Sequence, residues 1–183
     1  MPTDTGFAVG VAERARLPDP ERVAAGDVLV GLPSNGLHSN GYSLVRKVVV
    51  GLDPAAEHGL GRPLGDVVLD PTRIYVRDLL PLFRDGLVKG AAHITGGGLP
   101  GNVPRMLPES LGVHIDARSW QIPPIFRLLE ARGGLDMDDL LQTFNCGVGM
   151  VLAVAPGDVD AVLARTDGFR MGEVTAAPGV VVA

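Results

Sequence analysis

The stretch GLPSNGLHSNGYSLVRK, residues 31–47, runs from an apolar segment through a polar turn into an amphipathic helical pattern. The turn contains two Asn-Gly pairs, two serines and one histidine, His38. One Asn-Gly pair alone supplies the positive φ angles that a tight turn requires. The additional polar side chains therefore indicate that this turn binds or transforms a ligand as well as reversing the chain.

Apolar patterns on both sides of this turn predict a fold in which strands and helices interleave. Alternating or continuous apolar runs predict strands at residues 6–14, 27–32, 88–94, 111–116, 149–155 and 169–175. Helical spacing predicts helices within residues 41–49, 71–83, 123–134, 136–144 and 158–166. Pro71 marks one helix start, and Pro81 should kink that helix or end it early. This order predicts one α/β (α+β) domain over residues 1–183, with a mixed sheet of about six strands flanked by helices.

The charge and cysteine content exclude several classes of protein. The net charge is −5, and fourteen arginines and only two lysines are dispersed along the chain, so no basic surface for nucleic acid is predicted. A single cysteine excludes an internal disulfide and fits a reducing compartment. No apolar run reaches the ~18 residues of a membrane span, and the first residues are too charged for a signal peptide. We therefore predict a cytoplasmic protein that binds neither membranes nor nucleic acid.

A second glycine-rich stretch, AAHITGGGLPGN (residues 91–102), follows a predicted strand. Three successive glycines can turn their backbone N–H groups toward one point and form an anion-binding concavity. We therefore predict a phosphate-binding loop, and the alternative is a tightly packed turn. A dinucleotide-binding unit would require an unbroken crossover helix after the glycines, and prolines interrupt that interval. The residues predicted to contact the anion are Thr95, Gly96, Gly97, Gly98, Asn102 and Arg105.

The histidines and the cysteine differ in their sequence surroundings. His38 lies among short polar residues at a helix start, so it is the candidate for proton transfer. His93 ends an apolar strand and is predicted to be a hydrogen-bonded structural histidine, with a ligand contact as the alternative. His58 and His114 are predicted to be solvated, and Cys146 is predicted to be a small buried apolar residue. The sequence contains no P-loop and no paired-cysteine or His-Glu-x-x-His metal motif.

Four blocks, taken in order, resemble the carboxy-terminal domain of the phosphoribosylformylglycinamidine cyclo-ligase (aminoimidazole ribonucleotide synthetase) family. The resemblance extends from about residue 6 to the end of the chain. At Asn35 the chain departs from the family, which usually has a second serine there. The blocks are GLPSNGLHSNGYSLVRK, DPTRIYVRDLL, HITGGGLPGNVPRMLP and PPIFRLLEARGGLDMDDLLQTFNCGVGMVL.

The resemblance implies a step of purine biosynthesis. In that family ATP phosphorylates the formyl oxygen of formylglycinamidine ribonucleotide, and an amidine nitrogen then closes the imidazole ring with loss of phosphate. The resemblance further implies that His38 is an acid or base, that Ser39 and Asn40 bind the substrate, and that Gly36 and Gly41 allow its close approach.

The resemblance also implies that a second domain is required. The family's amino-terminal domain holds magnesium, most of the ATP-binding surface and the interface of the homodimer. Because this chain lacks that domain, we expect it to be a domain fragment that is inactive alone and binds no cofactor tightly. The alternatives are a noncatalytic phosphate- or nucleotide-binding module, or a related ATP-dependent enzyme such as selenophosphate synthetase or thiamine-monophosphate kinase.

Overall fold

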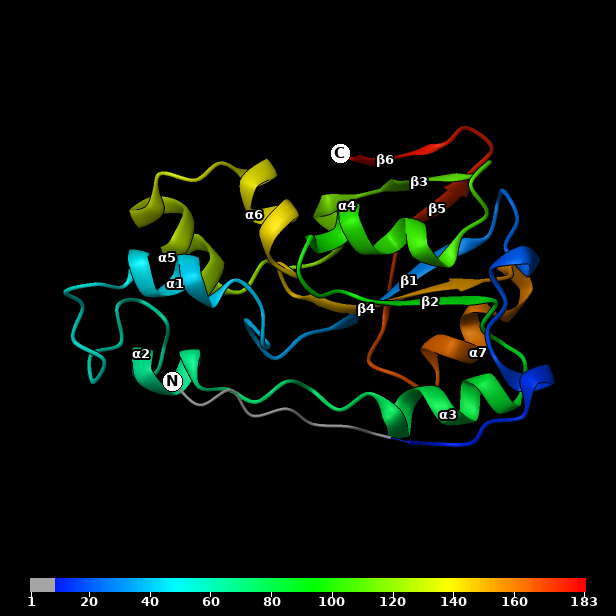
Figure 1. The fold of residues 1–183 in the computed structure, drawn as a ribbon, viewed down its shortest axis with the longest axis horizontal. Helices are drawn as coiled ribbons and strands as arrows, with labels where there is room; N and C mark the ends of the chain where they lie inside the picture. The colour runs from blue at the N-terminus through cyan, green and yellow to red at the C-terminus, as the bar shows by residue number, and fades with distance from the viewer. Residues whose placement is uncertain (1–8) are drawn as a thin grey trace.

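The computed structural model describes residues 9–183 and contains one mixed sheet of six strands in the order β2-β4-β1-β5-β3-β6 (Figure 1). All neighbouring strands pair antiparallel except β3 and β6, which pair parallel. The fold class predicted from the sequence is confirmed. The strands are β1 (Val28–Pro33), β2 (Gly90–His93), β3 (Gly112–Ile115), β4 (Val148–Val154), β5 (Phe169–Thr175) and β6 (Gly179–Val182).

Helices cover both faces of this sheet at β1 and β4, and these two strands are apolar throughout. In Figure 1, α4 lies on one side of β2 and β4, whereas α3 and α7 lie on the other. All seven residues of β4 are buried, which is typical of a strand covered on both faces. The helices are α1 (Tyr42–Val48), α2 (Leu64–Val68), α3 (Val76–Arg84), α4 (Gly98–Asn102), α5 (Pro124–Gly133), α6 (Met137–Thr143) and α7 (Val159–Leu163).

Successive residues of the central strands belong to two different apolar cores. In β4, Val151 packs into the core formed with α1, α2, α4, α5 and α6, whereas Leu152 packs into the core beneath α3 and α7. This alternation follows from the two-residue repeat of a strand. The larger core extends beyond the sheet to α1, α5 and α6, and it forms the base on which the two glycine-rich segments lie.

Most predicted elements are confirmed within a few residues, and two predictions are wrong. No strand forms over residues 9–14, since residues 9–13 are irregular and Arg14 begins a short 3-10 turn; residues 6–8 of that predicted strand lie outside the described residues. The helix predicted from Pro71 begins only at Val76; of the two effects expected of Pro81, a kink or an early end, the early end does not occur, because α3 continues to Arg84. Strand β6 and helices α2 and α4 were not predicted.

Two simpler predictions concern single residues and membrane insertion. Cys146 is fully buried, and burial raises the pKa of its thiol to about 12, which confirms it as a small apolar core residue. His114 is exposed on β3, as its alternation with Val113 and Ile115 predicted. Within residues 9–183, no helix is long and apolar enough to cross a membrane.

Candidate functional site

The polar turn between β1 and α1 is fixed from beneath by a buried asparagine. The Asn145 side chain donates to the Gly36 carbonyl at 2.9 Å and accepts from the Ser34 hydroxyl at 2.9 Å. Asn145 is fully buried, and its carbonyl oxygen also accepts from the Gly147 N–H group. The first half of the turn therefore has a rigid backbone, because a buried amide with its hydrogen bonds satisfied is costly to displace.

His38 lies inside this turn and is itself buried. Its residue exposure is 2%, and its φ of 56° lies in the left-handed region, which is uncommon for a residue with a side chain. Nε2 accepts from the Asn35 N–H group at 3.4 Å, and Nδ1 has no hydrogen-bond partner among the described residues. Burial, and then the charges of His93 and Arg73, lower the pKa of His38 to about 4. The imidazole is therefore neutral at pH 7 in this chain.

The second half of the turn contacts two other segments. The Ser39 hydroxyl lies 3.0 Å from the Thr72 hydroxyl, and Asn40 Oδ1 accepts from the Gly96 N–H group at 3.1 Å. Gly41 precedes α1 with a φ of 71°, and a Cβ there would lie 2.2 Å from the Phe144 ring. The structure thus brings together the predicted residues of both glycine-rich stretches, 56 positions apart in the chain.

The three successive glycines have different surroundings. The Gly96 N–H donates to Asn40, and the Gly98 N–H donates to the Thr95 carbonyl at 3.0 Å. A Cβ on Gly98 would lie 1.7 Å from the Leu141 carbonyl oxygen, whereas a Cβ on Gly96 would meet open space. Gly98 therefore serves close packing against α6. The Gly97 N–H group donates to no backbone carbonyl or side chain within residues 9–183.

Asn102 holds the glycine loop from inside. It is 2% exposed, and its amide donates to the carbonyls of Thr95, Gly96 and Gly98, at 2.8 Å in the case of Gly98. Its Oδ1 accepts from the Thr95 hydroxyl at 3.3 Å. Any contact of Asn102 with a substrate would replace these bonds, so we assign it the role of bracing the loop.

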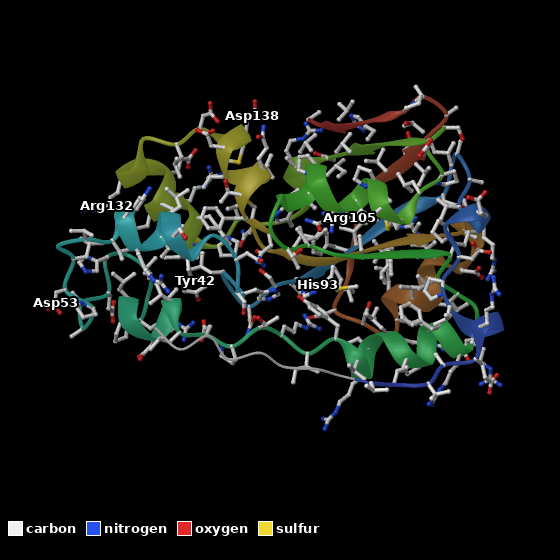
Figure 2. All side chains as sticks on the ribbon, viewed as in Figure 1. Tyr42, Asp53, His93, Arg105, Arg132 and Asp138 are labelled. Atoms are coloured by element: carbon white, nitrogen blue, oxygen red, sulfur yellow. The ribbon has the colours of Figure 1, made fainter. Side chains whose placement is uncertain are left out.

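A pocket of about 290 Å³ opens beside the loop, and the guanidinium side chain of Arg105 lines it. Arg105 is exposed and forms no ion pair within residues 9–183. Figure 2 labels Arg105 and His93, which both lie near β2 at the centre of the molecule. The residues lining the pocket are Ala91, Ala92, His93, Thr95, Asn102 and Arg105.

His93 does not have the surroundings predicted for it. The residue is exposed, and its ring forms no hydrogen bond within the described part of the chain, so the prediction of a hydrogen-bonded structural histidine is wrong. The His93 ring instead lies close to two other aromatic rings. Its centroid is 6.2 Å from that of the His38 ring and 6.1 Å from that of the Tyr75 ring. Partial burial of the ring lowers the pKa of His93.

Sequence reasoning missed Arg73 and Tyr75, which come from the block DPTRIYVRDLL. The Arg73 guanidinium donates to both carboxylate oxygens of Asp167, to Asp78 and to the Pro33 carbonyl. The Tyr75 hydroxyl also donates to Pro33, at 2.9 Å. The helix predicted from Pro71 concealed them, because an extended segment presents Arg73 and Tyr75 on the same side. The signal in the sequence was the alternation Thr-Arg-Ile-Tyr at residues 72–75. This stretch lies within one of the four blocks that resemble the cyclo-ligase family.

A larger depression of about 490 Å³ is lined by His38, by residues of α1 and by residues 68–72. Tyr42, labelled in Figure 2, donates its hydroxyl to the Val68 carbonyl at the edge of this depression. Arg46 also lines it, and Arg46 forms no ion pair within residues 9–183. Arg46 thus lines a depression together with His38, and Arg105 lines a pocket together with His93, which makes the region suitable for an anionic ligand.

The comparisons with known proteins identify the family. Residues 24–183 match the family model described as "AIR synthase related protein, C-terminal domain", so the chain belongs to this family. The resemblance to the carboxy-terminal domain of phosphoribosylformylglycinamidine cyclo-ligase is thereby confirmed.

Curated relatives are similar along nearly all of this chain. The chain is 51% identical to phosphoribosylformylglycinamidine cyclo-ligase of Shouchella clausii, covering 97% of this chain and 54% of that protein. It is 48% identical to the enzyme of the same name from Myxococcus xanthus, covering 95% and 53%. The human trifunctional purine biosynthetic protein adenosine-3 is 52% identical over 86% of this chain and 16% of its own length. The chain thus spans about half the length of the bacterial relatives.

Solved structures of more distant proteins share the fold. Thiamine-monophosphate kinase from Stenotrophomonas maltophilia has a TM-score of 0.62 at 19% identity, over 93% of this chain and 54% of that one. E. coli HypE, a hydrogenase maturation protein, has a TM-score of 0.60 at 22% identity, over 90% and 48%. T. maritima PurL complexed with AMPPCP has a TM-score of 0.55 at 20% identity, over 94% and 25%.

Proposed function

We propose that this chain provides the carboxy-terminal half of the active site of a phosphoribosylformylglycinamidine cyclo-ligase. The observation that carries the proposal is the bond between Asn40 and the Gly96 N–H group, which joins two blocks shared with that family into one surface. The reaction is ATP-dependent. ATP phosphorylates the formyl oxygen of formylglycinamidine ribonucleotide, an amidine nitrogen attacks the activated carbon, and ADP and phosphate are released.

Within this reaction the glycine loop and its neighbours hold an anionic group of the substrate. Gly97 offers a free backbone N–H group, and Arg105 offers a free cation beside the loop. A backbone donor and a guanidinium together form charge-assisted hydrogen bonds with a phosphate. Ser39, Asn40, Gly41, Thr95, Gly96 and Gly98 shape the surface on which the ligand rests, and Asn102 keeps the loop in place.

The residues described do not fit a magnesium site. Within residues 9–183, no three histidine, cysteine, aspartate or glutamate side chains come together in a way that could hold a metal ion. We therefore assign magnesium, most ATP contacts and the homodimer interface to the half of the relatives that this chain does not cover. It follows that residues 1–183 alone close no ring. The proposed location is the cytoplasm.

A chimeric enzyme tests the proposed function. The half of the Shouchella clausii cyclo-ligase not covered by this chain is fused to residues 1–183, and ADP release is measured with and without formylglycinamidine ribonucleotide. We expect substrate-dependent turnover within about tenfold of the parent enzyme, and none from residues 1–183 alone. The parent enzyme is the control for the assay.

Two results would overturn the proposal. A folded chimera without ring closure, beside an active parent, would contradict the assigned function, and phosphate binding by the chain would then favour the noncatalytic module. Substrate-dependent ADP formation by residues 1–183 alone would contradict the assignment of the remaining chemistry to another half.

A further inference from the structure

Three aromatic rings from three separate segments form one cluster in this molecule. The ring centroids of His38 and Tyr75 lie 6.2 Å apart, those of His38 and His93 lie 6.2 Å apart, and those of Tyr75 and His93 lie 6.1 Å apart. The rings meet at interplanar angles of 51–65°. Edge-to-face contacts of this kind add specific orientation to apolar burial.

Tyr75 is the best-fixed member of the cluster. Its hydroxyl donates to the Pro33 carbonyl at 2.9 Å, and the Arg73 guanidinium lies 4.9 Å from its ring centroid. A Cβ at Gly149 would lie 1.7 Å from the Tyr75 hydroxyl oxygen and 2.9 Å from His38 Cε1. The glycine in β4 therefore provides the space for both rings, and any larger residue would separate them.

The two histidines differ in their access to solvent. His38 is buried, with an unpartnered Nδ1, whereas His93 is exposed and lines the pocket that contains Arg105. We propose that Tyr75 is a positioning residue that holds His38 and His93 as an imidazole pair, in which the exposed His93 is the ring that exchanges protons with a bound ligand. The importance of this pair for ring closure rests on the proposed function, whereas its geometry does not.

The charged groups around the pair come from five segments. Arg73 approaches from the extended segment before α3, and its charge is balanced by Asp78 of α3 and Asp167 before β5. Arg105 lines the pocket with His93. Arg46 of α1 and Asp70 line the depression on the His38 side.

The direction of the pKa shifts agrees with this division of roles. Burial is the largest cause of the lowered pKa of His38, and the nearby His93 and Arg73 lower it further, whereas His93 is lowered by burial alone. The exposed His93, which lines the pocket, is therefore the ring of the pair that is open to a proton from a ligand. His38 remains neutral beside it, and its Nδ1 has no hydrogen-bond partner among the described residues.

Titration of the imidazole C–H resonances in the isolated chain tests the proposal. In Tyr75→Leu an aromatic ring that packs near His93 is lost, so we expect the pKa of His93 to rise toward 6.5. In Tyr75→Phe the ring remains, and the pKa of His93 should stay near the wild-type value. Tyr42→Leu is the matched control, since Tyr42 also donates to a backbone carbonyl but is not part of the cluster, and the His93 titration should be unchanged.

A second variant keeps the test decisive if Tyr75→Leu does not fold. His93→Gln alters an exposed residue and removes the charge that lowers the pKa of His38, so the pKa of His38 should rise above about 4 while staying below 6.5. A His93 pKa that is equal in wild type and Tyr75→Leu, or a His38 pKa unaffected by His93→Gln, would overturn the proposal. These titrations require no turnover. Their result is therefore independent of whether the chimeric enzyme is active, so the two proposals are tested separately.

Discussion

The two glycine-rich segments of this molecule look alike in sequence but use glycine in different ways. Gly41 and Gly98 both adopt positive φ angles, and neither position has room for a Cβ atom. A Cβ on Gly41 would overlap the Phe144 ring, and a Cβ on Gly98 would overlap the backbone of Leu141 and Phe144. Gly96 has open space on the side where a Cβ would project, and its N–H group bonds to the other segment. The comparison teaches that a run of glycines can contain both residues that serve close packing and residues with open space around them. Only the surroundings of each Cα separate them.

Gly98→Ala should produce the largest change in stability. The added Cβ would lie 1.7 Å from the Leu141 backbone oxygen, so α4 and α6 must separate. We expect the free energy of unfolding to fall by about 3 kcal/mol or more in urea titrations. Gly101→Ala is the control, since nothing lies within 4 Å of its Cβ position, and it should cost almost nothing. Equal losses in the two variants would contradict the packing role of Gly98.

The pH dependence of stability should reveal the buried His38. Its pKa falls from 6.5 in the unfolded chain to about 4 in the fold, so the unfolded state binds more protons between these values. Stability is therefore full above pH 6.5 and decreases as the pH falls to 4, by up to about 3 kcal/mol. His38→Asn should flatten this part of the curve, and His114→Asn, at an exposed position, should leave it unchanged. A wild-type slope in His38→Asn would show that the histidine is not buried in its neutral form.

Gly41→Ala should have an intermediate effect. Its Cβ would lie 2.2 Å from the Phe144 ring, at a φ of 71°, so both crowding and backbone strain oppose the change. We expect a loss of about 2 kcal/mol by thermal and urea unfolding. Gly51 also has a positive φ, of 80°, but nothing lies near its Cβ position. The stability lost in Gly51→Ala therefore measures the backbone strain without the crowding. If both variants lose the same stability, Phe144 does not limit this position.

Sequence patterns predicted the parts of this fold that depend on local repeats. Strand β4 and helices α5 and α6 have aliphatic runs or clear helix ends, and they were predicted within a few residues. Strand β6 was missed because four residues at the chain end become a strand only by pairing with β3, 67 positions earlier at Gly112 and Gly179. Helices α2 and α4 were missed because their five residues, LGDVV and GLPGN, include glycine or proline, which have low helix propensity.

The candidate site was predicted in its pieces but not in its connections. His38 and the glycine loop were recognised from local composition, whereas the bond from Gly96 to Asn40 spans 56 positions and has no local signal. The burial of His38 was also hidden, because Asn145 fixes its turn at Gly36 and Tyr75 packs near its ring, both from distant segments. Polar composition indicates a site, and only the tertiary structure decides which side chains remain free to act.

Asn40→Ala should have the smallest effect on stability. The variant removes one hydrogen bond, to Gly96, at a partly exposed position, so we expect a loss of about 1 kcal/mol. The amide resonance of Gly96 should shift, because it loses its acceptor. Asn35→Ala is the control, since it removes a comparable bond to the Pro71 carbonyl without touching the glycine loop. A Gly96 resonance that moves equally in both variants would contradict the direct link.

The most direct test of the account is a titration of this chain with inorganic phosphate, followed by amide chemical shifts. If the two segments form one anion site, the amides of Gly96 and Gly97 and that of Asn40 should move together, and Gly97→Val should abolish the movement. Under the proposed function this chain provides only the carboxy-terminal half of the site, so binding should be weak. Shifts confined to one segment, shifts unchanged in Gly97→Val, or no shift at residues 95–102 would contradict the claim that the two segments form one site.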